Sequence, residues 1–543
     1  MKKTILAILL VTLMIGSVLT GCGGEQTTAG DDERVTISVA YPKADETWTQ
    51  DDYYKYITDK VNIDIEFQAL SSDSAAEKAR IMISSGSMTD IVYTSSFMLD
   101  EYSSYAEQGL VKGLPDGWKD KYPNLRFALE MTGVLDSLEE AGEGSVHALL
   151  RPMDHYTDYI DEFRAAFKEG KDLREMMSEQ KYLYIDRYGF AYRKDWAEKL
   201  GIKTQPIMEY DDFIDMVLKF KEADLGGVGA DNTVGIALDH TEAPNIFVTA
   251  FNSSYKFFNK DGKDEYVCGL LEDSTTEGVK AYVEAYRSGV LSPGFYTQKT
   301  QNLNSLFCSQ RSGVIFPRAE VSALRALNSE FEKANPGLKA SECIDVCWIK
   351  SPDGKVHGRE ASNYWGVYYL NPDMSDEKLD RIMALADYIS SEEGGPQIRL
   401  GLEGIDYKVE NGKYVNIRPK DENGNLESLD KKYPSNEFFR LFLNPLYMNE
   451  VTETDSYARE RMNTLVEEKL KNDISVLSWD DARDAYVADD YVKFNAAYDV
   501  NSMFAEIVVA EGNPEENWLK KRAEFEAEAK SVAEKMNKEL LGK

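Results

Sequence analysis

Aromatic and planar polar side chains at the ends of predicted strands form the candidate ligand-binding set of this chain. Flat aromatic rings cover the C–H faces of a sugar, while carboxylate, amide and guanidinium groups hydrogen-bond to adjacent hydroxyls. Aromatic residues make up 11% of the chain, with 32 tyrosines against 22 phenylalanines, and this tyrosine excess suits a wet, polar groove. The candidate binding residues are Tyr41, Asp45, Trp48, Thr94, Ser95, Asp186, His240, Asn252, Arg318, Trp365 and Glu403.

Cysteine and histidine do not fall at spacings that bind metal. The four cysteines after residue 22 are Cys268, Cys308, Cys343 and Cys347, and no CxxC pair occurs. In "ECIDVCWIK" the last two lie on a predicted strand, where residues four apart are about 13 Å from each other, beyond disulfide reach. The four histidines are scattered without an HExxH motif. We therefore expect buried, mostly free thiols, no zinc site and no cofactor.

The candidate residues must be positioned by strands that alternate with helices. Strands are predicted at 34–42, 61–70 and 90–96, with amphipathic helices at about 50–58 and 72–86 between them. Such alternation predicts an α/β fold with a mostly parallel sheet. Ligands of these sheets bind beyond the carboxyl ends of the strands, which directs attention to the residues that follow each one.

The rest of the chain continues this pattern. Further strands are predicted at "TVGIALD", "SGVIFPR", "DVCWIK" and "YWGVYYL". Residues 154–182 form an acidic, helix-prone insertion, and a long, charged, amphipathic helix without glycine extends from Asn517 to Leu541. No tandem repeat at a fixed period is visible.

The N-terminus predicts secretion and a lipid anchor. Lys2 and Lys3 precede an apolar run at residues 5–18, which is typical of a signal peptide (1–21). The following "LTGC" resembles the lipobox of bacterial lipoproteins, in which the cysteine is acylated and becomes the first residue of the mature chain. Cys22 is then the lipid attachment site, and residues 22–33 form a flexible, lipid-anchored linker. We expect an extracytoplasmic protein on the outer face of a bacterial cell membrane.

The charge of the chain excludes one class of function. The formal net charge is −33, which repels nucleic acids and anionic lipid headgroups. We therefore expect no nucleic-acid partner and membrane contact through the lipid anchor alone.

Four longer segments, taken in order, carry a family resemblance. They are "ISSGSMTDIVY", with Thr89 where the family usually has proline, "YGFAYRKDWAEKLGI", "FNKDGKDEYVCGLLEDSTTEGVKAYVEAYRSGVLSPGF" and "GLEGIDYKVENGKYV". Together they resemble the extracellular solute-binding proteins (family 1 type) of bacterial ABC sugar importers, specifically the large oligosaccharide-binding lipoproteins. The resemblance covers nearly all of residues 34–541.

The resemblance implies a two-lobed periplasmic-binding-protein-like fold (type II), with discontinuous α/β lobes joined by hinge crossings. The crossings are expected near 186–192, 348–352 and 405. The expected first lobe is 34–188 with 351–405, and the expected second lobe is 189–350 with 406–543. The implied protein is a monomer that captures an oligosaccharide between its lobes and delivers it to the permease subunits of an ABC transporter, without catalysing a reaction.

Each candidate residue also has a structural interpretation. Trp48 and Trp365 could equally seal a core. Asp186 and Arg318 could equally form an ion pair between the lobes.

Calcium is a further possibility, because alginate-binding members of the family carry a calcium loop. At the matching place this chain reads "DLGGVGADNT", where Asp224 and Asn232 are retained but Gly226 and Val228 replace oxygen donors. Since calcium takes six or more oxygen ligands, we expect no calcium there. The segment "DENGNLESLD" at 421–430 has the alternate spacing of a calcium loop but also predicts a hairpin turn at Asn-Gly.

Two other functions use the same residue types. A secreted glycan-degrading enzyme would add two carboxylates across the scissile bond, and 95 acidic residues leave many such pairs. A sensor component that presents its ligand to a membrane receptor would share the fold and differ in its partner.

Overall fold

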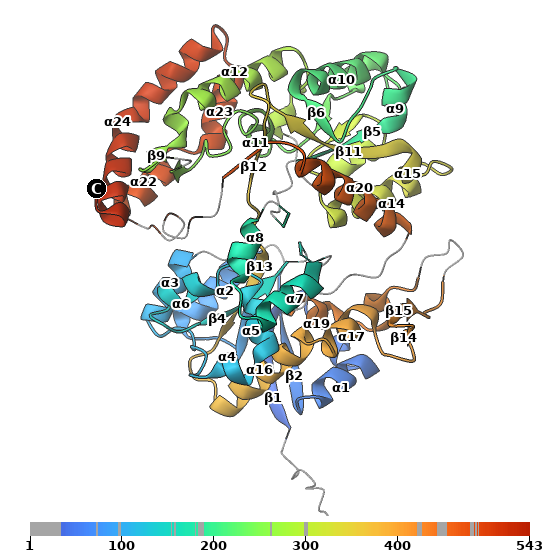
Figure 1. The fold of residues 1–543 in the computed structure, drawn as a ribbon, viewed down its shortest axis with the longest axis vertical. Coiled ribbons are helices and arrows are strands. Elements are labelled where there is room, and N and C mark those ends of the chain that lie inside the picture. Colours follow the sequence, from blue (N-terminus) through green and yellow to red (C-terminus); the bar gives the residue numbers. More distant parts are fainter. Residues whose placement is uncertain are drawn as a thin grey trace, which may run out of the picture.

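The computed structural model describes residues 34–543 apart from short gaps. These gaps are 72–73, 96–98, 154, 157–158, 180, 183–188, 261–262, 298–301, 421–425, 443–452, 478–479, 481–482, 484–485 and 487. The described chain forms two α/β lobes, one above the other in Figure 1, and each contains a five-stranded sheet. The predicted two-lobed α/β fold is therefore confirmed. Cys22 with its linker, and Asp186, lie outside the described residues.

The first lobe is built on a mixed sheet, in which parallel strands at one side meet antiparallel ones at the other, and not on the mostly parallel sheet predicted from the alternation of strands and helices, because β13 enters it from far along the chain. Its strand order is β2-β1-β3-β13-β4. β1 pairs in parallel with β2 and β3, whereas β13 runs antiparallel to both β3 and β4. The bounds are β1 (Val35–Pro42), β2 (Ile63–Leu70), β3 (Ile91–Thr94), β4 (Ala148–Pro152) and β13 (Tyr364–Leu370). The predicted strands at 34–42, 61–70, 90–96 and "YWGVYYL" are thus found in one sheet.

Helices cover this sheet and enclose a core of aromatic and aliphatic side chains. The end of α2 follows from its sequence, because Gly86 adopts a left-handed φ of 67° just after Ser85, a conformation that glycine adopts without strain. The helices are α1 (Asp52–Asp59), α2 (Ala75–Ser85), α3 (Leu99–Glu107), α4 (Trp118–Lys121), α5 (Pro123–Glu130), α6 (Leu135–Ala141), α7 (Ile160–Lys168), α8 (Leu173–Ser178), α16 (Asp376–Ser390), α17 (Gly394–Leu400), α18 (Leu429–Lys432) and α19 (Asn436–Leu441).

The second lobe has a sheet of order β6-β11-β5-β10-β7. Its strands are β5 (Phe190–Arg193), β6 (Ile207–Glu209), β7 (Ile236–Ala237), β10 (Val314–Ile315) and β11 (Ile344–Lys350). Its helices include α9 (Lys194–Lys199), α10 (Tyr210–Ala223), α11 (Ala243–Phe247), α12 (Asp273–Arg287), α13 (Leu303–Cys308), α14 (Val321–Ala334), α15 (Ala340–Cys343), α20 (Glu453–Lys469), α22 (Asp489–Ala497), α23 (Val500–Val509) and α24 (Pro514–Leu541). Cys268, Cys308, Cys343 and Cys347 are all buried free thiols in this lobe.

Two segments lie in the lobe opposite to the one expected from the sequence. β12 (Val356–Arg359) pairs in parallel with β16 (Ile474–Leu477), so it belongs to the second lobe. Conversely, α18 and α19 place Leu429 and Phe438 in the first-lobe core. Strand pairing and core packing between segments that are far apart in the sequence cause both differences. The expected lobe boundaries at 351 and 406 did not take these long-range contacts into account.

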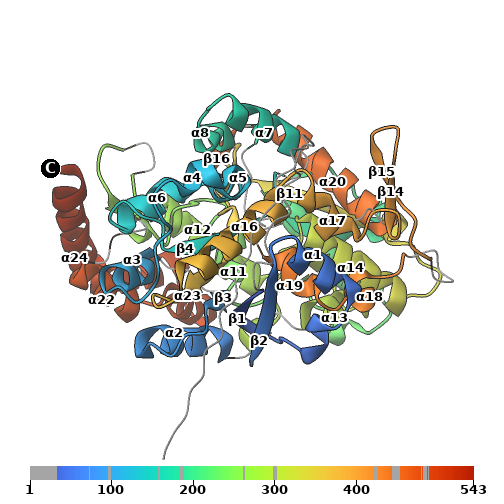
Figure 2. The ribbon, with the colours of Figure 1, turned by 90° about the horizontal axis from the view of Figure 1, so that it is seen from below.

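Two elements mark opposite sides of the molecule. The predicted C-terminal helix is present as α24, and it lies on the far side from the hairpin of β14 (Tyr407–Glu410) and β15 (Lys413–Asn416) in both Figure 1 and Figure 2. Among the described residues, no helix combines the length and the apolar character that crossing a membrane requires.

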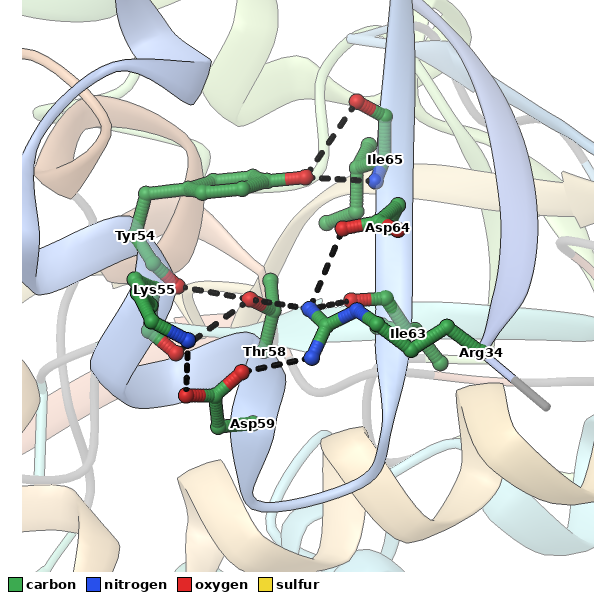
Figure 3. Close-up of polar contacts among 8 residues, drawn as sticks. All are labelled: Arg34, Tyr54, Lys55, Thr58, Asp59, Ile63, Asp64 and Ile65. Carbon is green, nitrogen blue, oxygen red and sulfur yellow. Dashed lines mark hydrogen bonds and ion pairs between the residues drawn. The ribbon is translucent and has the colours of Figure 1, made fainter. Parts of the chain in front are cut away.

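Arg34 fastens the start of the described chain to the first lobe (Figure 3). Its guanidinium forms ion pairs with Asp59 at 2.5 Å and Asp64 at 3.1 Å, and it donates to the Thr58 hydroxyl at 3.2 Å. Lys55 also binds Asp59, at 2.6 Å. These contacts join the start of β1 to α1 and β2 (Figure 3).

Candidate ligand-binding cleft

A cleft between the two lobes is the candidate functional site. Its volume is about 310 Å³, at the lower end of the range of ligand sites. Residues of both lobes line it. They are Met153, His155, Ala361, Ser362, Tyr364 and Trp365 on the first-lobe side, and Glu242, Asn245, Lys256, Phe316, Pro317, Glu320 and Arg359 on the second-lobe side.

Trp365 is presented to the cleft by an irregularity in the first-lobe sheet. The register between β13 and β4 shifts between Tyr364 and Val367, and such bulges re-aim the side chains beside them. Gly366 within the shift has a φ of 86°, and a Cβ there would lie 2.5 Å from the Tyr93 hydroxyl, so a larger residue does not fit. Trp365 remains 48% exposed, which leaves its indole available for stacking.

Arg151 of β4 lies against the same indole. Its guanidinium carbon is 5.1 Å from the centroid of the Trp365 ring, within the range of cation–π contacts. The Nε and Nη1 atoms of Arg151 are buried and have no hydrogen-bond partner. Burial raises the pKa of the neighbouring Tyr93, although the charge of Arg151 and a hydrogen bond with it act in the opposite direction. A partly buried cation therefore lies directly behind the aromatic wall of the cleft.

The second-lobe side offers hydrogen-bonding groups beside an apolar floor. Asn245 of α11 donates from Nδ2 to the Glu242 carboxylate at 2.6 Å, and its Oδ1 accepts from the Tyr255 hydroxyl at 3.2 Å. Phe316 and Pro317, which follow β10, supply the apolar surface. Aromatic and aliphatic surface next to fixed polar groups is the usual composition of a small-molecule site.

The charged residues of this side pack against aromatic rings. The Lys256 ammonium lies 5.7 Å from the Phe257 ring, and the Arg359 guanidinium lies 5.8 Å from the same ring. Together with Glu242 and Glu320 they give the second-lobe side of the cleft both donors and acceptors. This arrangement can bind a ligand that bears many hydroxyls.

Among the predicted binding residues that the structure describes, Trp365 is the one that lines the cleft. Arg318 follows the cleft residue Pro317, and its Nε donates to Asn304 Oδ1 at 3.2 Å. Asp186 lies outside the described residues.

Two predicted aromatic residues belong to the first-lobe core instead. Trp48 is 6% exposed, and its ring lies 5.2 Å from that of Phe67. Tyr41 is 4% exposed and lies 4.8 Å from the Tyr93 ring; burial raises its pKa. Trp48 thus follows the structural interpretation that the sequence allowed, and Tyr41 lies within β1 rather than after its end.

Asn252 has a structural environment as well. Its Nδ2 donates to Glu272 Oε2 at 3.0 Å and to Thr275 Oγ1 at 2.9 Å, and its Oδ1 accepts from the Ser254 amide at 2.9 Å. The side chain is buried, so these bonds organise the turn before β8 (Phe258–Asn259) and join it to the start of α12.

The remaining predicted residues do not line the cleft. Asp45 is exposed and caps a short 3₁₀ turn by accepting from the Thr47 amide at 2.8 Å; this interaction lowers its pKa. His240 Nδ1 lies 3.4 Å from Asp239 Oδ1. Thr94 is buried at the end of β3 and Ser95 is exposed after it, while Glu403 is exposed beside β14.

Several cleft residues were missed by the sequence analysis. His155 follows β4, a strand that the sequence analysis did not include, although the apolar run before Pro152 is the signal that could have shown it. Asn245 follows β7 and Glu320 follows β10, each within several residues. A search of the residues after each predicted strand could therefore have found them. Lys256 and Arg359 show no local signal, since distant packing brings them to the cleft.

The candidate calcium loop at Asp224 is closed by protein hydrogen bonds. Asp224 Oδ1 accepts from the Val228 amide at 3.1 Å and the Thr233 hydroxyl at 3.2 Å, and Oδ2 accepts from the Gly229 amide at 2.9 Å. Donors rather than oxygen ligands thus surround the carboxylate. Within the described parts of the chain, no group of three or more His, Cys, Asp or Glu residues could hold a metal ion. The other candidate loop falls partly on residues 421–425, outside the described chain.

A second cavity, of about 270 Å³, lies wholly in the first lobe among α4 to α8. Charged residues around it are already paired, with Arg126 Nε 2.7 Å from Glu130 and Lys119 Nζ 2.6 Å from Glu139. The interlobe cleft is therefore the better candidate, because two surfaces contribute to it and Trp365 is exposed there.

Comparison with known proteins gives distant relatives. No family model matches the chain. The chain is 22% identical to the polygalacturonan/rhamnogalacturonan-binding protein YtcQ of Bacillus subtilis over 420 residues, which is 75% of this chain and 74% of that protein. It is 22% identical to the lipoprotein LipO of the same organism, over 46% of this chain and 50% of LipO.

A third relative has a known structure. The fructooligosaccharide ABC transporter substrate-binding protein FusA of Streptococcus pneumoniae is 23% identical over 55% of each chain. The structure of its EF-hand mutant in complex with fructo-nystose superposes with a TM-score of 0.61 at 16% identity, covering 94% of this chain and all of FusA. The chain therefore has the two-lobed fold of ABC-transporter substrate-binding proteins and is a distant relative of them.

Proposed function

We propose that the protein captures an oligosaccharide between its lobes and delivers it to the permease subunits of an ABC transporter. The observation that carries this proposal is the interlobe cleft, in which a half-exposed Trp365 on one lobe faces hydrogen-bonding groups such as Asn245 on the other. A ligand that contacts both surfaces stabilises the closed arrangement of the lobes. YtcQ and FusA, which bind polysaccharide and fructooligosaccharide by their names, support this class of ligand.

The function includes no chemical step. The named relatives are substrate-binding proteins, which favours a binder over the glycan-degrading enzyme. A sensor that presents its ligand to a receptor remains the alternative with the same cleft, and it differs only in the partner that receives the closed form.

The protein acts outside the cytoplasm as a monomer held by a lipid on Cys22. The support is the lipobox-like "LTGC" after an apolar run and the distant relationship to the lipoprotein LipO. The segment 22–33 then joins the lipid to the rest of the chain, which begins at Arg34.

We further propose that the protein needs no cofactor and no calcium. FusA has an EF-hand, as the name of its mutant structure states. In this chain, backbone amides donate hydrogen bonds to the Asp224 carboxylate.

A thermal-shift screen with calorimetric follow-up tests the proposed function. Neutral and acidic oligosaccharides of two to six units are each added to the full-length mature chain. A ligand at a hundredfold excess over its Kd should stabilise the protein by about 2.7 kcal/mol. Release of new reducing ends from the same mixtures would instead indicate the glycan-degrading enzyme.

A further inference from the structure

We infer that Tyr255, a buried residue outside the lining of the cleft, is a positioning residue for ligand binding. Its hydroxyl holds the Asn245 amide in one plane, and this amide, beside the Glu242 carboxylate, then binds two adjacent hydroxyl groups of the oligosaccharide. The inference rests on the proposed function and deepens it, because it concerns the same cleft. None of these three residues was among those expected from the sequence.

A chain of two hydrogen bonds sets the orientation of the Asn245 amide. The terminal torsion of asparagine is broad, so one hydrogen bond alone does not fix the plane of the amide. An ionised carboxylate can only accept, and Asn245 Nδ2 donates to Glu242 Oε2 at 2.6 Å. At the other end, Asn245 Oδ1 accepts from the Tyr255 hydroxyl at 3.2 Å. The carboxylate thus determines which end of the amide faces it, and the hydroxyl restrains the plane of the amide.

The second lobe holds all three groups in place. Tyr255 is 2% exposed, and its ring lies 5.7 Å from that of Phe504 on α23. Glu242 and Asn245 lie three residues apart at the start of α11, where the Asn245 backbone N–H donates to the Glu242 carbonyl at 3.0 Å. Residues at this spacing lie on the same face of a helix. Groups that are fixed before the ligand arrives lose less conformational freedom when they bind it.

The Asn245 amide keeps hydrogen-bonding capacity for a ligand. An amide has two N–H donors and two acceptor sites on its oxygen, and within the described chain each end of this amide makes one hydrogen bond. Asn245 and Glu242 are partly exposed and line the cleft. One N–H and one acceptor site therefore remain side by side. This pair matches two adjacent sugar hydroxyls, one of which accepts while the other donates.

Asn252 shows what a structural asparagine looks like in the same lobe. Its Nδ2 donates to Glu272 at 3.0 Å and to Thr275 at 2.9 Å, and its Oδ1 accepts from the amide and the hydroxyl of Ser254 at 2.9 and 2.8 Å. The side chain is buried. The protein thus uses the whole amide of Asn252, whereas it uses half of the Asn245 amide and leaves the rest to the cleft.

Calorimetry on the mature chain tests the role of Tyr255. The probes are fructooligosaccharides and oligogalacturonates of three to six units. Tyr255→Phe removes the hydroxyl and keeps the ring, so the variant should bind whichever probe the parent binds about three- to tenfold more weakly.

Tyr266→Phe is the matched control. Tyr266 is also buried in the second lobe, and its hydroxyl donates to Asp480 at 2.9 Å, away from the cleft residues. Loss of this hydroxyl should lower the melting temperature and leave the affinity for the probe unchanged. A loss of affinity in the control equal to that in Tyr255→Phe would show a general effect on the fold and would overturn the positioning role.

A double-mutant cycle separates positioning from an independent structural role. Asn245→Ala should weaken binding about tenfold or more, because the ligand loses two hydrogen bonds. Tyr255→Phe should have no further effect in this background, since the hydroxyl then has no amide to hold. Thermal melts show whether each variant is folded. If Tyr255→Phe does not fold, unchanged affinity in Asn245→Ala would by itself overturn the inference.

The outcomes separate the inference from the proposed function. Equal affinity of the parent and Tyr255→Phe for a probe would overturn the inference and leave the proposed function standing. Losses of affinity that add in the double variant would overturn the positioning role. Binding of no probe by the parent would overturn the proposed function, and the inference with it.

Discussion

The guanidinium of Arg151 lies 5.1 Å from the centre of the Trp365 indole, although 213 residues separate the two in the sequence. They meet because β4 and β13 are antiparallel neighbours, with Tyr364 opposite Pro152. The register shift beside Trp365 leaves its other face open to the cleft. One pair of strands thus positions both an aromatic surface and a cation at the place where the lobes face each other.

Replacement of Trp365 by alanine should weaken ligand binding more than it weakens the fold. Loss of the apolar contact costs roughly 1.5 to 3 kcal/mol, which is about a tenfold to hundredfold loss of affinity. Trp48→Ala is the matched control, because Trp48 is buried in the first-lobe core and its loss should cost about 3 to 5 kcal/mol of stability. Calorimetry and thermal melts of both variants measure these effects. Unchanged affinity in Trp365→Ala would argue against the cleft.

Removal of calcium should leave the melting temperature unchanged. Asp224 already accepts hydrogen bonds from the amides of Val228 and Gly229, so no ion is required to neutralise the loop. Asp224→Ala should lower stability by about 1 to 3 kcal/mol, with or without chelator. A fall in melting temperature on chelation that calcium reverses would refute this account of the loop.

Stability should rise with pH between about 8 and 10 through Lys469. Burial lowers the pKa of this side chain to about 8, and the residue is 2% exposed. The unfolded chain keeps the proton up to about 10.4, so between the two pKa values the unfolded state binds more protons and folding is favoured as pH increases. Urea denaturation of the parent and of Lys469→Met at several pH values between about 8 and 10 measures the effect. Over this range the free energy of unfolding of the parent should rise by on the order of 2 kcal/mol more than that of the variant. If the free energy of unfolding of the two proteins changes equally with pH, Lys469 does not titrate in this range.

Replacement of Cys22 by serine should release the protein from cells. Lipid chains on Cys22 are the proposed attachment to the membrane. Most of the variant should therefore appear in the culture medium, as measured by fractionation and immunoblotting. Cys268→Ser, at a buried thiol of the second lobe, is the control and should stay cell-associated. Equal retention of both variants would mean that another contact holds the protein.

Local sequence patterns predicted much of the first lobe. Strand alternation located β1 and β2, and Gly86 marked the end of α2, because these features depend on residues close in the chain. The lobe boundaries were less predictable: β12 belongs to the second lobe through its pairing with β16, over 100 residues away.

The site was harder to predict than the fold. The sequence did not distinguish Trp48 from Trp365 as a cleft residue. In the structure Trp48 is buried against Phe67, whereas Trp365 is exposed in the cleft. Asn252 has an amide group of the kind that hydrogen-bonds to sugars, but this amide donates to Glu272 and Thr275 instead. Whether a polar side chain binds the ligand or its own chain depends on contacts between distant segments, which local patterns do not encode.

Hydrogen exchange with and without a bound oligosaccharide tests the central claim most directly. A ligand clamped between the lobes should slow amide exchange in the first-lobe segment 361–365, which includes Trp365, and in the second-lobe segments 242–256 and 316–320 at the same time. Protection at both sides of the cleft is the result that this account predicts. Protection confined to one lobe, or to the cavity among α4 to α8, would contradict it.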